Sequence, residues 1–581
     1  MTSEPRTIKR REFLKLSGAA LAIAAAGDWG RASARTSLRT PVARPDLCIP
    51  GWQGTLLIDG ESTANWSVEH DAGSQGSLAQ VPGLQGLAVQ LAWDMGSGNW
   101  VQGKYTFPVP QDLSQADIFG VSLEGGGAAE QANTVALMFA DVNDVFYGYD
   151  LPGRYRGINQ IDRWLNNLSL PKKLLRHFFS FGDETEIDWT RIDRFFFVVK
   201  RICTLRPEKG EETCFGGGTG QLTVDHVQVD TAADWPRQTQ FEVARADPQH
   251  AAQALSYILG QQDPATGLFV SWAEEALENP PAKAWLYDQA LVLIAVTREG
   301  KWANETPLNP TAQAADALVD FITGRQQTDG HWARAWNPAT GEELVDDGWV
   351  GDQAWWVLAL AFYAQKSGRA TAADSAQLGA GWLAAQIDAT GKVVGSTEGN
   401  VDVWWAMIAT DRMADAEKIK HYLLDEDTVW DAELQYWWRG FNDPEKAMDT
   451  ATWLSAFVRH PLVNQPERGK AALSFVRRTL VTDSEDGSLC GLDGMGPVSI
   501  WNEGMAQYVA AGGAGAQAFL EVLLAQQNPD GSMPSSTANW ASDAYGWLTT
   551  WRGLAPTAWL VFAITGAPFP MHHVYLPFVS T

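Results

Sequence analysis

The second half of the chain, residues 240–581, repeats one pattern, in which a predicted helix ends in Gln and is followed by a turn rich in Asp and Gly. The clear copies of this turn lie at 260–264, 325–330, 386–391 and 526–531, and degenerate copies lie at 427–438 and 482–493. In a repeat protein, each unit buries its apolar face only against its neighbours. The six copies therefore predict a domain of six helical hairpins.

An apolar helix follows each turn. These helices start at 287–290, 351–355, 398–404, 448–453, 501–506 and 555–559. Apolar residues run all round them, which is typical of helices buried between other elements, whereas alternating segments such as 310–323 are more amphipathic. Six pairs of one outer and one inner helix describe an (α/α)6 toroid. On this pattern, residues 240–581 resemble the (α/α)6-barrel glycoside hydrolases and related polysaccharide lyases.

Residues 46–233 follow a different pattern, with short apolar runs separated by Gly-rich turns. The runs lie at 103–109, 116–123, 134–139, 194–199 and 221–229. Many short strands of this kind predict an antiparallel β-sandwich or jelly roll. The segments 100–102, 112–117, 188–189 and 222–227 resemble the galactose-binding-like jelly rolls, a group that includes carbohydrate-binding modules. The predicted fold is therefore a β-sandwich followed by an all-α toroid.

Residues 1–34 read as a targeting segment rather than as part of either domain. Paired arginines, Arg10 and Arg11, precede Phe-Leu-Lys and a mild apolar run, and the small residues 32–34 offer a cleavage site. The pattern resembles a twin-arginine export signal, which implies export of the folded protein to the periplasm or the medium. No later stretch approaches the 18 apolar residues of a membrane span.

The charge balance limits the partners of the chain. There are 69 acidic residues against 43 Lys and Arg, a formal net charge of −26, which argues against nucleic acid as a partner because binding to phosphates needs clustered basic residues. Cys203 and Cys214 flank a polar loop, a spacing that allows them to pair. The sequence lacks the spacing of Cys and His typical of a structural zinc site, and we expect neither a metal nor another cofactor. The oligomeric state is not predicted.

Five of the six predicted inner helices carry carboxylates near their start. In a toroid the inner helices all run the same way, so these side chains are expected to meet at one face; they are Asp288, Asp352, Glu398 with Asp402, Asp449 and Glu503. A simpler interpretation of each acid is a helix cap, which the helix dipole favours by about 0.3–1 kcal/mol. Convergence of the whole set on one cavity favours a functional site.

Aromatic residues in the adjoining loops indicate the substrate. The chain has 28 Trp, and flat apolar rings with one N–H donor suit stacking on sugars. We expect glycan contacts from Asp402, Asp449, His331, Trp272, Trp332, Trp336, Trp349, Trp437, Trp438 and Trp501. Several carboxylates at one face, surrounded by loop tryptophans, predict cleavage of a neutral glycan.

Glycoside hydrolysis needs one protonated carboxylic acid beside the leaving oxygen and one ionised carboxylate. Crowded carboxyls in a partly dry cleft raise one another's pKa, which leaves one of them protonated near neutral pH. Glu503, between Asn502 and Gly504, is the leading candidate for the general acid. Asp352 is the leading candidate for the base, followed by Asp288 and Glu398. These roles rest on position and chemistry rather than on a family motif.

Two alternatives remain open. A polysaccharide lyase would need a basic residue to neutralise a uronate and a Tyr or His to remove a proton, for which Arg334, Arg439, Tyr436 and His331 are available. The acidic ring argues against this reading, because it repels an anionic polymer. The second alternative is a non-catalytic glycan-binding protein of polysaccharide export.

Overall fold

The structure is a computed structural model that describes residues 54–565, except 85, 127–131, 152–163, 207–210, 232–236, 279, 301, 303–308, 426–427, 485–487, 495–498 and 539–548. The predicted export segment at 1–34, Cys48 and the outer ends of the two predicted domains lie outside the described residues.

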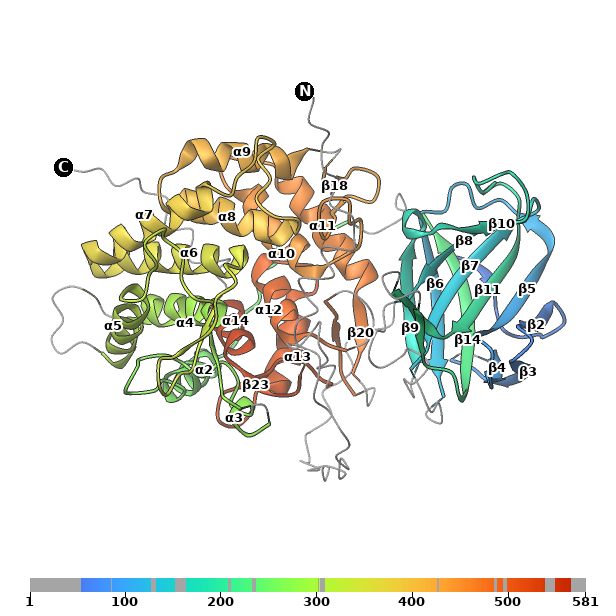
Figure 1. Ribbon diagram of the computed structural model, residues 1–581, viewed down its shortest axis with the longest axis horizontal. Helices are drawn as coiled ribbons and strands as arrows, with labels where there is room; N and C mark the ends of the chain where they lie inside the picture. The colour runs from blue at the N-terminus through green and yellow to red at the C-terminus, as the bar shows by residue number, and fades with distance from the viewer. Residues whose placement is uncertain are drawn as a thin grey trace. The chain divides into compact units, whose positions relative to one another are not determined.

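The first part of the chain forms two six-stranded sheets in which every strand pair is antiparallel (Figure 1). The first sheet has the order β3 (Gln75–Pro82), β4 (Leu87–Asp94), β14 (Thr219–Asp230), β6 (Ile118–Gly125) and β9 (Trp164–Pro171), with β1 (Thr55–Ile58) paired to β14. The second has the order β10 (Arg176–Ser180), β8 (Val145–Asp150), β7 (Thr134–Asp141), β11 (Ile192–Lys200), β5 (Trp100–Gln111) and β2 (Trp66–His70).

Aromatic side chains from the two sheets share one core. Phe119 of β6 and Phe139 of β7 lie with ring centroids 4.3 Å apart, and Phe195 of β11 packs on Phe139 at 5.2 Å. All three rings are fully buried. Contact between β6 in one sheet and β7 in the other is consistent with the sandwich that the alternating pattern predicts.

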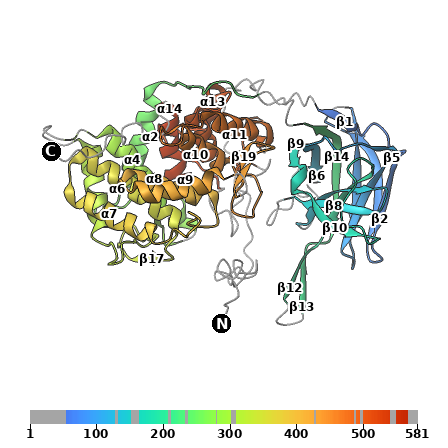
Figure 2. The same ribbon diagram turned by 90° about the horizontal axis from the view of Figure 1, so that it is seen from above.

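A separate hairpin carries two of the cysteines. It consists of β12 (Ile202–Arg206) and β13 (Glu211–Phe215), and Figure 2 shows it extending away from the sheets. Its antiparallel register sets the Cα of Cys203 directly opposite that of Cys214. A bond between these two cysteines stays a prediction. Cys490, in the helical part, is disulfide-bonded and buried.

The second part contains twelve described helices of ten or more residues, in two alternating classes (Figure 1). In the first class most residues are buried, and we call its members the inner helices: α4 (Leu286–Glu299), α6 (Val350–Ser367), α8 (Thr397–Ala409), α10 (Met448–Arg459), α12 (Asn502–Ala511) and α14 (Leu554–Ile564). The outer helices also have exposed faces: α2 (Pro248–Gly260), α5 (Pro310–Thr323), α7 (Ala370–Ala384), α9 (Met413–Leu424), α11 (Pro466–Thr479) and α13 (Ala516–Gln526).

Contacts among the inner helices form a closed cycle. Each packs against the next in chain order from α4 to α14, and α14 packs against α4. The connections hold the four-residue helix α3 (Glu275–Glu278) and short ribbons: β15 (Ala284–Trp285), β16 (Ala335–Trp336), β17 (Glu343–Val345), β18 (Trp430–Asp431), β19 (Tyr436–Trp437), β20 (Val481–Asp483), β21 (Cys490–Leu492), β22 (Met533–Pro534) and β23 (Arg552–Gly553). Within the described part of the chain, no helix combines the length and the hydrophobicity needed to cross a bilayer.

The glycine of the repeated turn touches the next outer helix. Four of these glycines have φ between +77° and +110°, a region that side chains with a Cβ rarely adopt. A Cβ at each would lie 2.1–2.7 Å from a backbone carbonyl oxygen; the pairs are Gly267 with Ala317 of α5, Gly330 with Leu378 of α7, Gly391 with Lys418 of α9, and Gly531 with Gln253 of α2. The turn therefore needs glycine for conformation and for close approach.

The glutamine of the same turn adds a hydrogen bond to that neighbouring helix. The Nε2 atom donates both to its own turn and to a backbone carbonyl oxygen 2.9–3.0 Å away; these bonds join Gln262 to Ala314 of α5, Gln326 to Ser375 of α7, and Gln527 to His250 of α2. Because the turn after α13 binds the first helix, α2, the outer helices are also linked from the last to the first.

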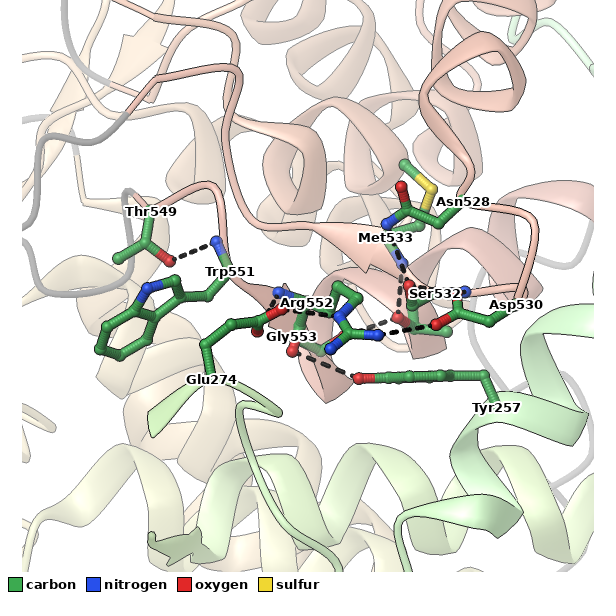
Figure 3. Close-up of polar contacts among 11 residues, drawn as sticks. Tyr257, Glu274, Asn528, Asp530, Ser532, Met533, Thr549, Trp551, Arg552 and Gly553 are labelled. Atoms are coloured by element: carbon green, nitrogen blue, oxygen red, sulfur yellow. Dashed lines mark hydrogen bonds and ion pairs between the residues drawn. The ribbon is translucent and has the colours of Figure 1, made fainter. Parts of the chain in front are cut away.

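Figure 3 shows a second contact at this junction. Arg552 Nε donates to Glu274 Oε1 at 2.6 Å, and its Nη1 donates to Asp530 Oδ2 at 3.0 Å. The Tyr257 hydroxyl of α2 donates to the Arg552 carbonyl oxygen at 3.4 Å. These contacts tie the segment just before α14 to the α2–α4 connection, which joins the two ends of the helical part.

Candidate active site

The predicted acids lie in the first turns of the inner helices, with Asp402 one turn further along α8, and α14 has no acid in its first turn. They are not the N-cap residues, which are Trp285, Trp349, Ser396, Ala447 and Trp501. Of these five, only Ser396 caps its helix with a side-chain hydrogen bond. Capping therefore does not account for the acids as a set.

The six carboxyls are close enough to raise one another's pKa. The charges of Glu503 and Asp352 both raise the pKa of Asp288, although burial is the larger cause. Four of the acids are at most 8% exposed, namely Asp288, Asp352, Asp402 and Glu503, while Glu398 and Asp449 are half-buried. We call these six residues the acid cluster. Within the described residues, no group of three or more His, Cys, Asp or Glu side chains is arranged to hold a metal ion.

Glu503 has the best-defined surroundings in the acid cluster. The Tyr287 hydroxyl donates to Glu503 Oε1 at 2.6 Å, and Gln507 Nε2 lies 3.5 Å from the same oxygen. Burial raises the pKa of Glu503 to about 7; the charge of Asp449 adds to this rise, and the two hydrogen bonds oppose it. A carboxyl with this pKa is present in both protonation states near neutral pH, as a general acid requires.

Glu398 and Asp449 form a hydrogen-bonded pair of carboxyls. Burial and the charge of Asp449 raise the pKa of Glu398 well above its usual range. Burial also raises the pKa of Asp449, but the hydrogen bonds from Thr450 N, at 2.7 Å, and from Glu398 favour its ionised form. The two carboxyls thus share a proton that lies mainly on Glu398, which leaves Asp449 as the acceptor.

Two stacked indoles act on Asp402. Trp453 donates from Nε1 to Asp402 Oδ1, and the side chain of Trp355 also favours the ionised form of this carboxyl. The two rings lie 4.8 Å apart at an interplanar angle of 12°. Burial raises the pKa of Asp402 well above its usual range despite these bonds.

Asp352 pairs with Arg334 from the preceding loop. Arg334 Nε lies 2.8 Å from Asp352 Oδ2, and its Nη1 lies 3.1 Å from Asp347 Oδ2. The guanidinium also lies over the rings of Trp285 and Trp349, at 5.2 and 4.8 Å from their centroids. Burial raises the pKa of Asp352, and Arg334 opposes that rise.

Three of the predicted sugar-contacting tryptophans are core residues instead. Trp332, Trp336 and Trp437 have no exposed surface. The ring of Trp332 packs on Gly379 of α7, and Trp437 Nε1 donates to the Leu423 carbonyl oxygen at 3.0 Å. The prediction of glycan contact is wrong for these three rings, because they fill the space between outer and inner helices.

The other predicted tryptophans differ in exposure. Trp349 is 53% exposed, Trp272 and Trp438 are half-buried, and Trp501 is 7% exposed. Trp272 Nε1 donates to Ser535 Oγ at 3.2 Å, and Trp438 Nε1 donates to Asp431 Oδ2 at 3.2 Å. Trp349 is thus the predicted ring that combines an open surface with a contact to Arg334.

His331 has partners outside the acid cluster. Its Nδ1 lies 2.6 Å from Asp329 and its Nε2 lies 3.2 Å from Asp346, and its ring stacks on Trp382 at 5.6 Å. Burial lowers the pKa of His331, but the two carboxylates outweigh it and the net shift is upward. These contacts show that His331 interacts with the loop carboxylates of Asp329 and Asp346.

The groups available to a lyase are already engaged. Arg334 binds Asp352, and Arg439 Nε binds Asp443 at 2.8 Å. Tyr436 is 2% exposed, and its hydroxyl donates to the Pro444 carbonyl oxygen. The described contacts therefore give no support to a uronate site built from these residues.

Sequence reasoning missed several partners of the acids. Tyr287, Trp355, Trp453 and Gln507 all contact a carboxyl of the acid cluster. Helical spacing was a usable signal for three of them, since residues three or four positions apart share a helix face. Trp355 follows Asp352 by three positions, whereas Trp453 follows Asp449 and Gln507 follows Glu503 by four.

Comparison with known proteins gives distant matches to solved structures. No protein-family model and no curated protein matches the chain. A family 11 carbohydrate-binding module from Clostridium thermocellum, in complex with a β-1,3-1,4-mixed-linked tetrasaccharide, is 13% identical and covers 30% of this chain and 95% of its own, with a TM-score of 0.23.

Two further solved structures match more of the chain. A glycosidase in complex with glucose is 12% identical over 55% of this chain and 96% of its own, with a TM-score of 0.43. A rhamnosidase from Klebsiella oxytoca with rhamnose bound is 12% identical over 88% of this chain and 98% of its own, with a TM-score of 0.39. At these values the matches assign no role to any residue, so the function is argued from the site.

Proposed function

We propose that this protein is a glycoside hydrolase that cleaves a neutral glycan by carboxylate acid/base chemistry. The carrying observation is the acid cluster, in which the buried Glu503 accepts a hydrogen bond from Tyr287 and burial raises its pKa to about 7. A cluster of six acids attracts no anionic polymer, which favours a neutral glycan as the substrate. The proposed folds are a galactose-binding-like β-sandwich over 46–233 and an (α/α)6 toroid over 240–581.

In this proposal Glu503 donates a proton to the leaving glycosidic oxygen, and Asp352 activates the attacking water. The ion pair with Arg334 supports Asp352 as the base, because it favours the ionised carboxylate. The cycle of inner helices supports the pairing, because α6 and α12 stand three steps apart in a cycle of six. A glycan between them would meet Glu503 on one side and Asp352 on the other.

The remaining acids have supporting roles in this proposal. Glu398 is the donor in its pair with Asp449, which makes it a poor base. Burial raises the pKa of Asp288 well above its usual range, so Asp288 also ranks below Asp352 as the base. Asp402 and Asp449 accept hydrogen bonds, and a sugar hydroxyl can donate to such acceptors. Trp349 is the proposed stacking surface, because its ring is exposed and lies over the guanidinium that binds Asp352.

The test uses Glu503→Gln and Asp352→Asn with a panel of neutral and uronic oligosaccharides. Each variant should lose about 10²–10⁴-fold in kcat while still binding the glycan that the wild type cleaves. Glu242→Gln is the matched control, because Glu242 Oε2 accepts from Gly515 N at 2.9 Å and so stabilises the start of α13. Near-wild-type hydrolysis by both site variants would show that the chemistry lies elsewhere.

The same panel separates the alternatives. Products that absorb at about 235 nm would indicate a lyase, because elimination leaves an unsaturated uronate. Retention of an uncleaved polymer by the wild type would indicate a glycan-binding protein without catalytic activity.

We further propose that residues 1–34 direct export through the twin-arginine route to the periplasm or the medium. The support is the pair Arg10 and Arg11 ahead of an apolar run. Replacement of both arginines by lysine should leave folded precursor in the cytoplasm. Normal export of that variant would contradict the assignment.

A further inference from the structure

Tyr287 links four of the six inner helices through its side chain. It is the second residue of α4, and its hydroxyl donates to Glu503 of α12 at 2.6 Å. The same oxygen accepts from Trp559 Nε1 of α14 at 3.2 Å. Its ring meets Trp355 of α6 edge-on, with centroids 5.5 Å apart and an interplanar angle of 84°. The hydroxyl is therefore held in place by contacts on both the ring and the oxygen.

The direction of these bonds determines what Tyr287 does to Glu503. Burial and the charge of Glu503 raise the pKa of Tyr287 well above its usual range, so the hydroxyl stays protonated and donates a hydrogen bond to Glu503. Trp559 donates to the same oxygen, which polarises the O–H group and strengthens its bond to the carboxylate. A donor of this kind stabilises the ionised carboxylate more than the protonated acid.

We propose that Tyr287 is a positioning residue that orients the Glu503 carboxyl and sets the pH range over which this acid carries its proton. The catalytic part of this proposal rests on the proposed function, in which Glu503 is the general acid. Without the hydroxyl, Glu503 would lose a hydrogen bond that favours its ionised form, so its pKa would rise further and its proton would be harder to release. With the hydroxyl, proton transfer at neutral pH becomes possible in both directions of the catalytic cycle.

Among the described residues, the other groups that act on Glu503 come from three inner helices and from its own helix. They are Asp288 of α4, Glu398 of α8, Asp449 of α10 and, on its own helix, Gln507. From α14, the described contact is that of Trp559 with Tyr287. Tyr287→Phe removes one oxygen and leaves these groups in place, so a change in Glu503 titration reports the missing hydrogen bond.

The test titrates Glu503 directly in the full-length protein, with ¹³C NMR of glutamate labelled at Cδ. The Glu503 signal is assigned by its absence from Glu503→Gln. In Tyr287→Phe the midpoint should move upward by about one pH unit, because a hydrogen bond to a charged group is lost. Trp559→Phe should move it in the same direction by less. An unchanged midpoint in Tyr287→Phe would overturn the proposal.

Tyr363→Phe is the matched control. Tyr363 is a buried tyrosine whose hydroxyl also donates to a carboxylate, that of Asp316 on an outer helix. Its loss should leave the Glu503 midpoint unchanged. A shift of equal size in this variant would show a general effect of losing a buried hydroxyl and would overturn the proposal.

Hydrolysis supplies a second readout. The alkaline limb of the kcat/KM profile, measured on the oligosaccharide cleaved by the wild type, should move upward with the NMR midpoint. Loss of activity at every pH without a shift of this limb would contradict a positioning role. Full activity of Glu503→Gln would instead refute the proposed function, whatever the NMR titration of Tyr287→Phe shows.

Discussion

Arg334 Nε lies 2.8 Å from Oδ2 of Asp352, so one member of the acid cluster is paired with a cation. The same guanidinium reaches Asp347, and the other charges that act on this part of the acid cluster are Asp288 and Asp402. The ion pair opposes the effect of burial on the pKa of Asp352.

Loss of this cation should shift the pH dependence of activity. Arg334→Gln removes the attraction that opposes the rise in the pKa of Asp352, so the proposed base should protonate at higher pH. The acid limb of kcat/KM should then move upward by about one pH unit. Arg369→Gln is the control, since Arg369 pairs with Asp320 and Asp316 of α5. An acid limb that stays in place in Arg334→Gln would contradict the role of Asp352 as the base.

The raised pKa of Glu503 also predicts a pH-dependent stability. Its pKa in the folded state is about 7, against 4.5 for an ordinary glutamate, so between these values the folded state binds more protons than the unfolded state. The free energy of unfolding should therefore fall by about 3 kcal/mol from this residue as pH rises from 4.5 to 7. Denaturant titrations at several pH values should show a smaller fall in Glu503→Gln. An identical fall in both proteins would contradict the raised pKa.

The repeat glycines should tolerate no side chain. A Cβ at Gly531 would lie 2.1 Å from the Gln253 carbonyl oxygen, and the φ of +92° is unfavourable for alanine. Gly531→Ala should lower the free energy of unfolding by about 2 kcal/mol or more. Gly381→Ala provides the contrast, because Gly381 lies inside α7 with nothing within 4 Å of a new Cβ. That change should stabilise by about 0.5–1 kcal/mol. Equal effects of the two changes would argue against the close contact.

Two tryptophans should separate packing from binding. Trp332→Ala should destabilise the protein by about 3–5 kcal/mol, because the ring has no exposed surface. Trp349→Ala should change thermal stability little, since its ring is 53% exposed, but should weaken retention on the glycan that the wild type cleaves. Unchanged retention by Trp349→Ala would remove this ring from the proposed substrate site.

Much of the helical part follows from the sequence. The fully apolar segments became the buried inner helices, because a helix without a polar face cannot lie at the surface. The turns with Gln and Gly carry the contacts between neighbouring outer helices, as at Gly531 and Gln527. The placement of Asp352 and Glu503 in first turns was also readable, since each comes just after the start of an apolar run.

Only the tertiary structure decided which aromatic rings are accessible and which acid titrates near neutrality. Trp332 and Trp349 look equivalent in the sequence, yet one is in the core and the other at the surface, because exposure depends on which helices pack over a loop. The surroundings of Glu503 depend on Tyr287, which is 216 positions away in the chain. A pKa responds to burial and to groups within a few ångströms, and these distances exist only after the inner helices pack together.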